Sequence, residues 1–238
     1  MAVAFRSVAS TVLPAGQQGT GKSGNTISFA MSAPASIADD DILIISVLVN
    51  YGGATLTGKS LPSGFTELWN TWQATSGDHW VVGWKRASSE SGSYTFAWTA
   101  DTQYVYADGI IAAYSGANTG TVIDASGASA SATTDTHHVA PSANATYTND
   151  FWIAMACEDN YSASALAGFN ERFDNTSYSA KLYDKTLSAS GATGTADIVM
   201  GSGNGRAGTI LLIDATPTGG GGGLSIPVAM AQYRQRWN

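Results

Sequence analysis

The chain has 238 residues and carries 18 acidic against 11 basic side chains, which gives a formal net charge of −7. This acidic balance excludes sequence-independent binding to nucleic acid, which needs a basic face, and it disfavours an anionic membrane. Only 12% of the residues are charged while 44% are hydrophobic, so we expect a globular fold whose polar surface is built from Ser, Thr, Asn and Gly.

The N-terminal residues contain no continuous apolar stretch that would predict a secretory signal. The longest apolar run, residues 42–49, is too short to span a bilayer, so no membrane insertion is expected. We therefore expect a chain made in a cytoplasm.

The stretch GQQGTGKS, residues 16–23, has the letters of a phosphate-binding loop. Such a loop needs a helix directly after the lysine and serine, because the helix N-terminus helps to hold the phosphate. Here Ile27, Phe29 and Met31 alternate with small or polar residues, which predicts a strand instead. We expect a glycine-rich hairpin loop, with no nucleotide site and no cofactor.

Apolar alternation continues along the chain and predicts further antiparallel strands. In residues 79–85, Trp80, Val82 and Trp84 fall on one face, and in residues 93–99 the Tyr, Phe and Trp side chains share a face. Clusters of Gly, Ser and Asn separate these runs. The pattern is typical of an all-β sandwich or barrel.

The order of these signals is repeated in the two halves of the chain. Residues 40–50 and 149–160 are apolar strands led by Asp, and each is followed by a Gly-Phe turn, a lysine-containing strand, a Ser-Gly turn and a closing apolar strand. Two sets of about four strands predict one antiparallel β-sandwich of eight strands, jelly-roll-like, with an internal two-fold duplication. Residues 124–136, rich in Ala and Ser, would be an exposed connection between the halves.

Little in the sequence favours a metal site or a reactive thiol. Three histidines, His79, His137 and His138, are expected to be exposed loop residues, and adjacent residues of an extended segment converge poorly on one metal. Residues 39–41, all Asp, are interpreted as a solvated turn before a buried strand. Cys157, the single cysteine, is interpreted as core packing. No metal is expected.

Glycoside cleavage would need two carboxylates that face each other across a cleft. Glu67, Glu90, Glu158 and Glu171 are available, but Glu67 and Glu171 fall at corresponding points of the two halves, after the Gly-Phe turns. That placement favours equivalent structural positions over a catalytic pair. We expect no enzymatic activity and keep a glycan-cleaving enzyme as a remote alternative.

The seven tryptophans raise a carbohydrate-binding interpretation, because aromatic faces stack on sugar rings. Trp69, Trp72, Trp80, Trp84 and Trp98 could line a groove, although at sheet spacing they also fit a core or a subunit interface. The candidates for a glycan-facing surface are Trp69 and Trp72. A lectin-like adhesin that binds a host receptor is therefore the alternative function.

The sandwich domain is expected to span residues 1–214 and to be followed by a flexible glycine-rich linker over 215–223. The remaining residues, 224–238, carry two arginines and no acid, whereas residues 1–223 hold the other nine basic and all eighteen acidic side chains. This segment combines the aromatic and arginine side chains that dominate interfaces, so we predict a docking peptide. Its contact residues are Ile226, Val228, Met230, Tyr233, Arg234, Arg236 and Trp237.

Four segments of the chain resemble the glycine- and serine-rich β-sandwich proteins of tailed bacteriophage particles. They are DDILIISVLV (40–49), PSGFTELW (62–69), WKRASSESGSYTFAW (84–98) and ADGIIAAYSG (107–116). The resemblance covers about residues 1–214 and is one of general pattern. It implies a non-enzymatic virion protein of the decoration or tail-appendage type, often oligomeric and attached through a terminal peptide.

The resemblance also sets the expected partners and location. The partners would be other capsid or tail subunits and copies of the same chain, with a host surface glycan as a further candidate, and neither nucleic acid nor a membrane. The location would be the virion, assembled in the host cytoplasm.

Overall fold

The computed structural model is an all-β structure in which every strand pair is antiparallel. The predicted fold class, an antiparallel β-sandwich, is confirmed. No helix of the described residues is long and apolar enough to cross a membrane. The residues that the structure describes are 2–12, 26–50, 56–73, 78–99, 106–130, 136–157, 165–175, 180–201 and 205–216.

The first half of the chain forms a five-stranded sheet and a two-stranded ribbon. The sheet has the order β1-β7-β3-β5-β4, and β2 pairs with β6 in the ribbon. The alternation at residues 26–32 does form the predicted strand, β2. The bounds are β1 (Ala4–Val12), β2 (Thr26–Ser32), β3 (Ile42–Asn50), β4 (Thr66–Gln73), β5 (Asp78–Arg86), β6 (Ser93–Thr99) and β7 (Tyr106–Ser115).

The second half repeats this plan strand for strand. Its sheet has the order β8-β16-β11-β13-β12, and β9 pairs with β15. A short extra ribbon, β10 with β14, has no counterpart among the described strands of the first half. The bounds are β8 (Ile123–Ala130), β9 (His137–Ala140), β10 (Asn144–Ala145), β11 (Phe151–Cys157), β12 (Asn170–Asn175), β13 (Ala180–Thr186), β14 (Gly191–Ala192), β15 (Ala196–Val199) and β16 (Arg206–Leu212).

Four β-bulges confirm that the halves correspond. The strand that opens each half is bulged near its start, at Arg6 in β1 and at Asp124 in β8. The opposite edge strand of each sheet is bulged as well, at Leu68 in β4 and at Arg172 in β12. A bulge leaves one residue unpaired and re-aims its side chain. The predicted duplication is therefore present down to these local irregularities.

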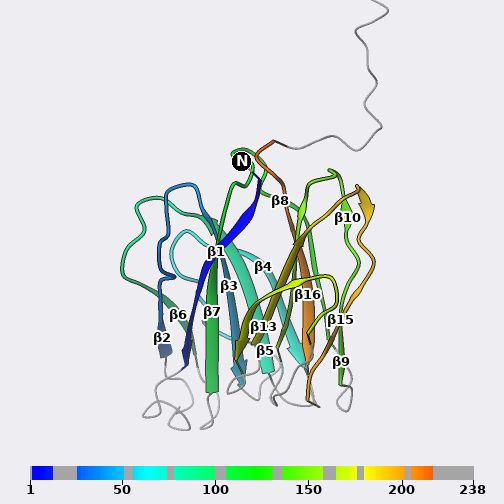
Figure 1. The fold of residues 1–238 in the computed structure, drawn as a ribbon. Coiled ribbons are helices and arrows are strands. Elements are labelled where there is room, and N and C mark those ends of the chain that lie inside the picture. Colours follow the sequence, from blue (N-terminus) through cyan, green and yellow to red (C-terminus); the bar gives the residue numbers. More distant parts are fainter. Residues whose placement is uncertain are drawn as a thin grey trace, which may run out of the picture.

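The two halves stack to give four layers (Figure 1). The ribbon of β2 and β6 covers the outer face of the first sheet, and β9 and β15 cover the outer face of the second. The two five-stranded sheets pack against each other by their inner faces. In β3, for example, Ile42 and Ile44 face the other half, whereas Leu43 and Ile45 face the ribbon. The central strands are apolar on both faces because both faces are covered.

The prediction of one sandwich of eight strands is wrong in the number and grouping of the strands. Each half is a sandwich of its own, with five strands facing two rather than four facing four. The physical reason is that the runs of β3 and β11 are buried on both faces, so each sheet needs a covering layer on either side. The predicted exposed connection over residues 124–136 is also wrong for residues 124–130, because they belong to β8, an edge strand of the second sheet. Residues 131–135 of that prediction lie outside the described residues.

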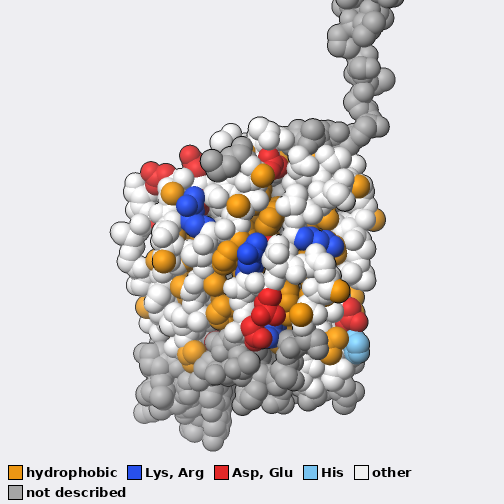
Figure 2. Space-filling model, in the orientation of Figure 1, with side chains coloured by type: hydrophobic (Ala, Val, Ile, Leu, Met, Phe, Trp, Pro, Cys, Tyr) orange, Lys and Arg blue, Asp and Glu red, His pale blue; other side chains and the backbone are white. Residues whose placement is uncertain are grey.

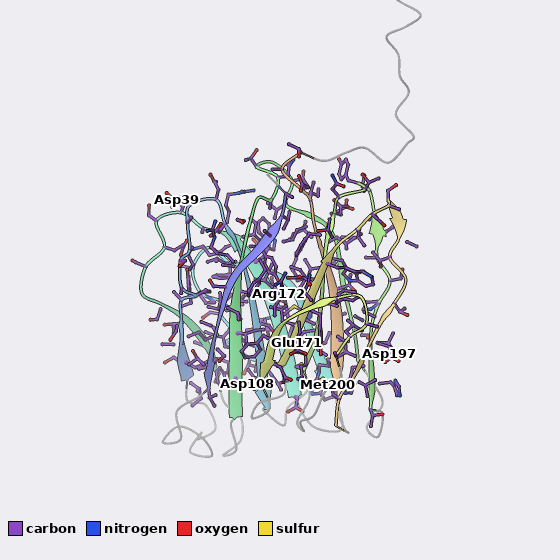
Figure 3. The ribbon with its side chains drawn as sticks, in the orientation of Figure 1. Asp39, Asp108, Glu171, Arg172, Asp197 and Met200 are labelled. Carbon is purple, nitrogen blue, oxygen red and sulfur yellow. The ribbon has the colours of Figure 1, made fainter. Side chains whose placement is uncertain are left out.

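The contact between the halves follows a two-fold relation. Strand β1 lies against β12, and β4 lies against β8. Because β1 corresponds to β8 and β4 corresponds to β12, exchanging the halves reproduces the same contacts, as in a symmetric dimer. Arg172, labelled near the centre of Figure 3, marks one such contact with its guanidinium 4.9 Å from the ring centre of Phe5.

Candidate functional site

Several residues singled out by the sequence lie outside the described part of the chain. These are the stretch 16–23, Glu158, the end of the predicted linker and the whole segment 224–238. The docking role of Ile226, Val228, Met230, Tyr233, Arg234, Arg236 and Trp237 therefore stays a prediction.

The two glycan-facing candidates lie on opposite faces of β4. Trp69 pairs with Val82 and packs edge-on against Trp80, with 5.3 Å between the ring centres, inside the contact between the halves. Trp72 pairs with His79 and has 39% of its surface exposed. Residues three apart in a strand point to opposite faces of the sheet, so the sheet itself lies between the two indoles. Trp69 and Trp72 therefore do not line one groove.

The histidines do not lie where the sequence predicts. His79 in β5 and His138 in β9 are both buried, so the expectation of exposed loop residues is wrong for them. His137 is exposed, and its Nδ1 lies 2.8 Å from a carboxylate oxygen of Asp197. His137 and His138 do point to opposite faces of β9. Among the described residues no three His, Cys, Asp or Glu side chains gather.

The candidate catalytic carboxylates are separated from each other. Glu67 in β4 forms an ion pair with Lys59. Glu171 lies at the equivalent position of β12, as the sequence indicates. Because β4 and β12 are at opposite edges of the stacked sheets, these two carboxylates do not face one another. Glu90 lies elsewhere, in a polar hollow of the first half.

This hollow has a volume of about 440 Å³. It lies beside the first Gly-Phe turn, where Gly64 has a φ of 83° that favours glycine. Serine side chains dominate its rim. The lining residues are Pro62, Ser63, Lys85, Ser88, Glu90, Ser91, Ser93, Tyr94 and Thr95.

The ammonium group of Lys85 organises the hollow. Its Nζ lies 5.7 Å from the ring centres of both Phe65 and Tyr94 and 2.6 Å from Glu90 Oε1. Glu90 also accepts hydrogen bonds from the Tyr94 hydroxyl at 2.8 Å and from the Ser88 backbone N–H at 3.1 Å. Burial works to raise the pKa of Glu90, but these donors outweigh it and lower the pKa overall.

The pKa of Tyr94 is shifted in the opposite direction to that of Glu90. Burial and the Glu90 carboxylate raise the pKa of Tyr94 well above its ordinary value. At neutral pH the hollow therefore holds a neutral phenol, an ionised carboxylate and its ammonium partner. The carboxylate, its lysine partner and its hydrogen-bond donors are thus engaged with one another.

The second half builds the same arrangement without the carboxylate. Lys185 Nζ lies 4.2 Å from the ring centre of Phe169 and 4.6 Å from that of Trp152. The turn that follows this lysine strand, residues 187–190, contains no acidic residue, whereas the turn of the first half contains Glu90. No carboxylate of the described residues lies within ion-pair distance of Lys185, and burial lowers its pKa. Sequence analysis missed both lysine sites, although the repeated Gly-Phe turn and lysine strand were the available signal.

Comparisons with known proteins identify no relative for this chain. No protein-family description, no curated protein and no solved structure matches it. The function therefore has to be argued from the arrangement of the residues themselves.

Proposed function

We propose that this protein is a non-enzymatic structural component of a tailed-bacteriophage particle. It is displayed on the capsid or on a tail appendage and is anchored to neighbouring subunits by residues 224–238. The observation that carries the proposal is the way in which the folded body ends in front of that segment.

The last strand of the described residues, β16, is an inner strand of its sheet. Strand β16 is hydrogen-bonded to β11 on one side and to β8 on the other. Just beyond it, the Asp214 carboxylate accepts hydrogen bonds from the backbone N–H groups of Val3, at 3.1 Å, and Thr216, at 2.7 Å. A force applied to the residues after β16 would have to break its hydrogen bonds to both β11 and β8, whereas an edge strand is held by one neighbour only. This attachment suits a domain that is held by its C-terminal segment.

The described surface also suits display. Figure 2 shows Lys and Arg side chains scattered over one face, together with Asp and Glu side chains, without a basic patch. The glutamates Glu67 and Glu90 are engaged in ion pairs with lysines and do not converge on a cleft. These features favour a structural role over catalysis or binding to nucleic acid.

The test is removal of residues 224–238. We expect the shortened chain to remain folded, with an unchanged unfolding transition, and to be absent from purified particles when mass spectrometry counts its copies. A matched control exchanges Tyr233 and Trp237 for Ala in the full-length chain, which should lower the copy number without shortening the linker. Particles that incorporate the shortened chain at the normal copy number would refute the anchoring role.

A second function, binding of a host surface glycan, is favoured by Trp72. Its indole is exposed on the edge strand β4, where it stacks on the His79 ring with 6.5 Å between ring centres. An exposed and supported aromatic face is what a sugar ring stacks on. Trp72→Ala should abolish binding to a glycan array, whereas Val139→Ala, a comparably exposed apolar residue of the second half, should leave it unchanged.

A further inference from the structure

Both halves begin their central strand with the same aspartate turn. Asp41 precedes β3 and Asp150 precedes β11. Each carboxylate accepts a hydrogen bond from the backbone N–H three residues earlier, Ala38 at 2.8 Å and Tyr147 at 3.2 Å. Asp41 and Asp150 are therefore equivalent residues in equivalent turns, and their surroundings can be compared directly.

The bulged residue beside this aspartate carries opposite charge in the two halves. In the first half, Arg6 places Nε 2.6 Å from Asp41 Oδ2 and Nη2 3.0 Å from Oδ1. In the second half the bulge holds Asp124, whose side chain is within hydrogen-bond reach of Asp150. The position that supplies a cation in one half supplies a second carboxyl group in the other.

The second aspartate turn is left short of positive charge. Asp150 has no exposed surface, and its Oδ1 has no hydrogen-bond partner among the described residues. Burial and, after it, the neighbouring Asp124 raise the pKa of Asp150 to about 7. Within the described part of the chain no lysine or arginine forms an ion pair with either carboxyl group.

A third oxygen donor completes the group. The two oxygens of Asp124 accept hydrogen bonds from the Thr146 backbone N–H, at 2.6 Å, and from its hydroxyl, at 2.7 Å. Thr146 therefore holds the Asp124 carboxylate in place beside Asp150. The Thr146 hydroxyl keeps free lone pairs of its own.

We propose that Asp124 and Asp150 bind a calcium ion, which takes the place beside Asp150 that the Arg6 guanidinium takes beside Asp41. The donors are two carboxylates and a hydroxyl, all hard oxygens of the kind that Ca²⁺ prefers, and water would complete its six to eight ligands. With only two carboxylates the site belongs to the weak class, with a dissociation constant on the order of 10⁻⁴–10⁻³ M. The proposal departs from the sequence-based expectation of no metal and does not depend on the proposed function.

The ion would act as a clamp near the end of β16. Val122, two residues before Asp124, accepts a backbone hydrogen bond from Ile213 at 2.9 Å. Asp150 opens β11, the strand next to β16. Calcium would therefore join the start of the edge strand β8 to the turn in front of the central strand β11.

The test is thermal unfolding of the full-length protein at pH 8, in millimolar calcium chloride and in EDTA. Calcium should raise the Tm by a few degrees and bind as a single ion in calorimetry, because a ligand that binds only the folded state stabilises it. Asp124→Asn and Asp150→Asn should lose the calcium-dependent shift. Asp197→Asn, which changes an exposed carboxylate of the same half, should keep it.

Asp124→Arg separates a metal site from a merely fragile turn. This variant restores the ion pair of the first half, so it should fold at least as stably as the wild type in EDTA and show no calcium-dependent shift. A wild type with equal Tm in calcium and EDTA would overturn the proposal and leave a shared proton between the two carboxyls. A calcium-dependent shift that persists in both Asp124→Asn and Asp124→Arg would overturn it too, since the ion would then bind elsewhere.

Discussion

Gly208 in the second half lies directly beneath the indole of Trp69 in the first. A Cβ atom at Gly208 would lie 2.5 Å from one ring carbon of Trp69 and 3.0 Å from the nearest ring carbon of Trp80. The two halves approach this closely only because β16 has no side chain at that point. Trp69, a glycan candidate in the sequence analysis, is thus a contact between the halves.

Gly208→Ala should destabilise the protein because the added methyl group overpacks this contact. We expect a loss of about 1–3 kcal/mol in the free energy of unfolding, measured by denaturant titration. Gly127→Ala in β8 is the matched control, since a Cβ there would meet only Pro141 at 3.7 Å. Equal stability of the two variants would show that the indoles can move aside.

Arg172→Leu should be more damaging. Arg172 Nε lies 2.8 and 3.0 Å from the two carboxylate oxygens of Asp184, a fully buried residue, and its guanidinium also covers Phe5. Removing the cation leaves a buried carboxylate without its main partner, and breaking such a pair costs about 3–5 kcal/mol. Chemical unfolding gives the value.

A second variant shows whether Arg172→Leu destabilises the protein through the unpaired charge of Asp184 or through the lost packing on Phe5. Adding Asp184→Asn to Arg172→Leu removes the uncompensated charge and should recover a large part of the lost stability. If the double variant is as unstable as Arg172→Leu alone, the packing of the arginine side chain on Phe5 is the main contribution.

Ser46→Ala should leave the indole N–H of Trp80 without its acceptor. Trp80 Nε1 donates to Ser46 Oγ at 2.8 Å, and both residues are buried between the halves. An unsatisfied buried donor costs about 1–3 kcal/mol. Ser126→Ala, at an exposed position of β8, should change the free energy of unfolding by less than about 0.5 kcal/mol. A water molecule that replaces the serine would make the two variants alike.

Glu90→Gln should make stability less dependent on pH at the acidic end. The folded-state pKa of Glu90 lies below the ordinary value of 4.5, so the ionised carboxylate stabilises the fold above that value. This contribution is lost as the pH falls through the folded pKa. We expect Glu90→Gln to be less stable than the wild type by about 1 kcal/mol at pH 7, and the difference to shrink as the pH falls below 4.5. If the difference in stability between the two proteins does not change with pH, the effect comes from the altered side-chain contacts and not from the charge of Glu90.

The sequence predicted the strands and their duplication well, because apolar alternation and the repeated order of turns are local signals. It did not predict how the halves meet. The two-sided burial of β3 and β11 is visible in runs such as ILIISVLV, yet a run apolar on both faces does not say what covers each face. The small side chains of residues 123–130 led to the prediction of a loop. They fit the contact between β8 and β4 of the other half, and this contact joins residues far apart in the chain, so the local sequence does not reveal it.

The same limit applies to the sites. Trp69 and Trp72 are equally good candidates in the sequence. The bulge at Leu68 and the position of the second sheet decide that Trp69 is partly buried between the halves and that Trp72 is exposed. Asp124 could not be related to Arg6 before the bulges aligned the two strands. The interactions of Lys85 with Glu90 and Tyr94 join residues close in the chain, and a search for such pairs around each Gly-Phe turn could have found them.

The two-fold relation between the halves has a consequence for a half taken alone. Among the described residues each inner sheet face is covered by its counterpart, so a single half would expose a broad apolar surface and would associate with another copy of itself. The arrangement is that of a symmetric homodimer whose two subunits are joined in one chain. Equivalent positions of the two halves nevertheless hold different residues, as Arg6 and Asp124 show.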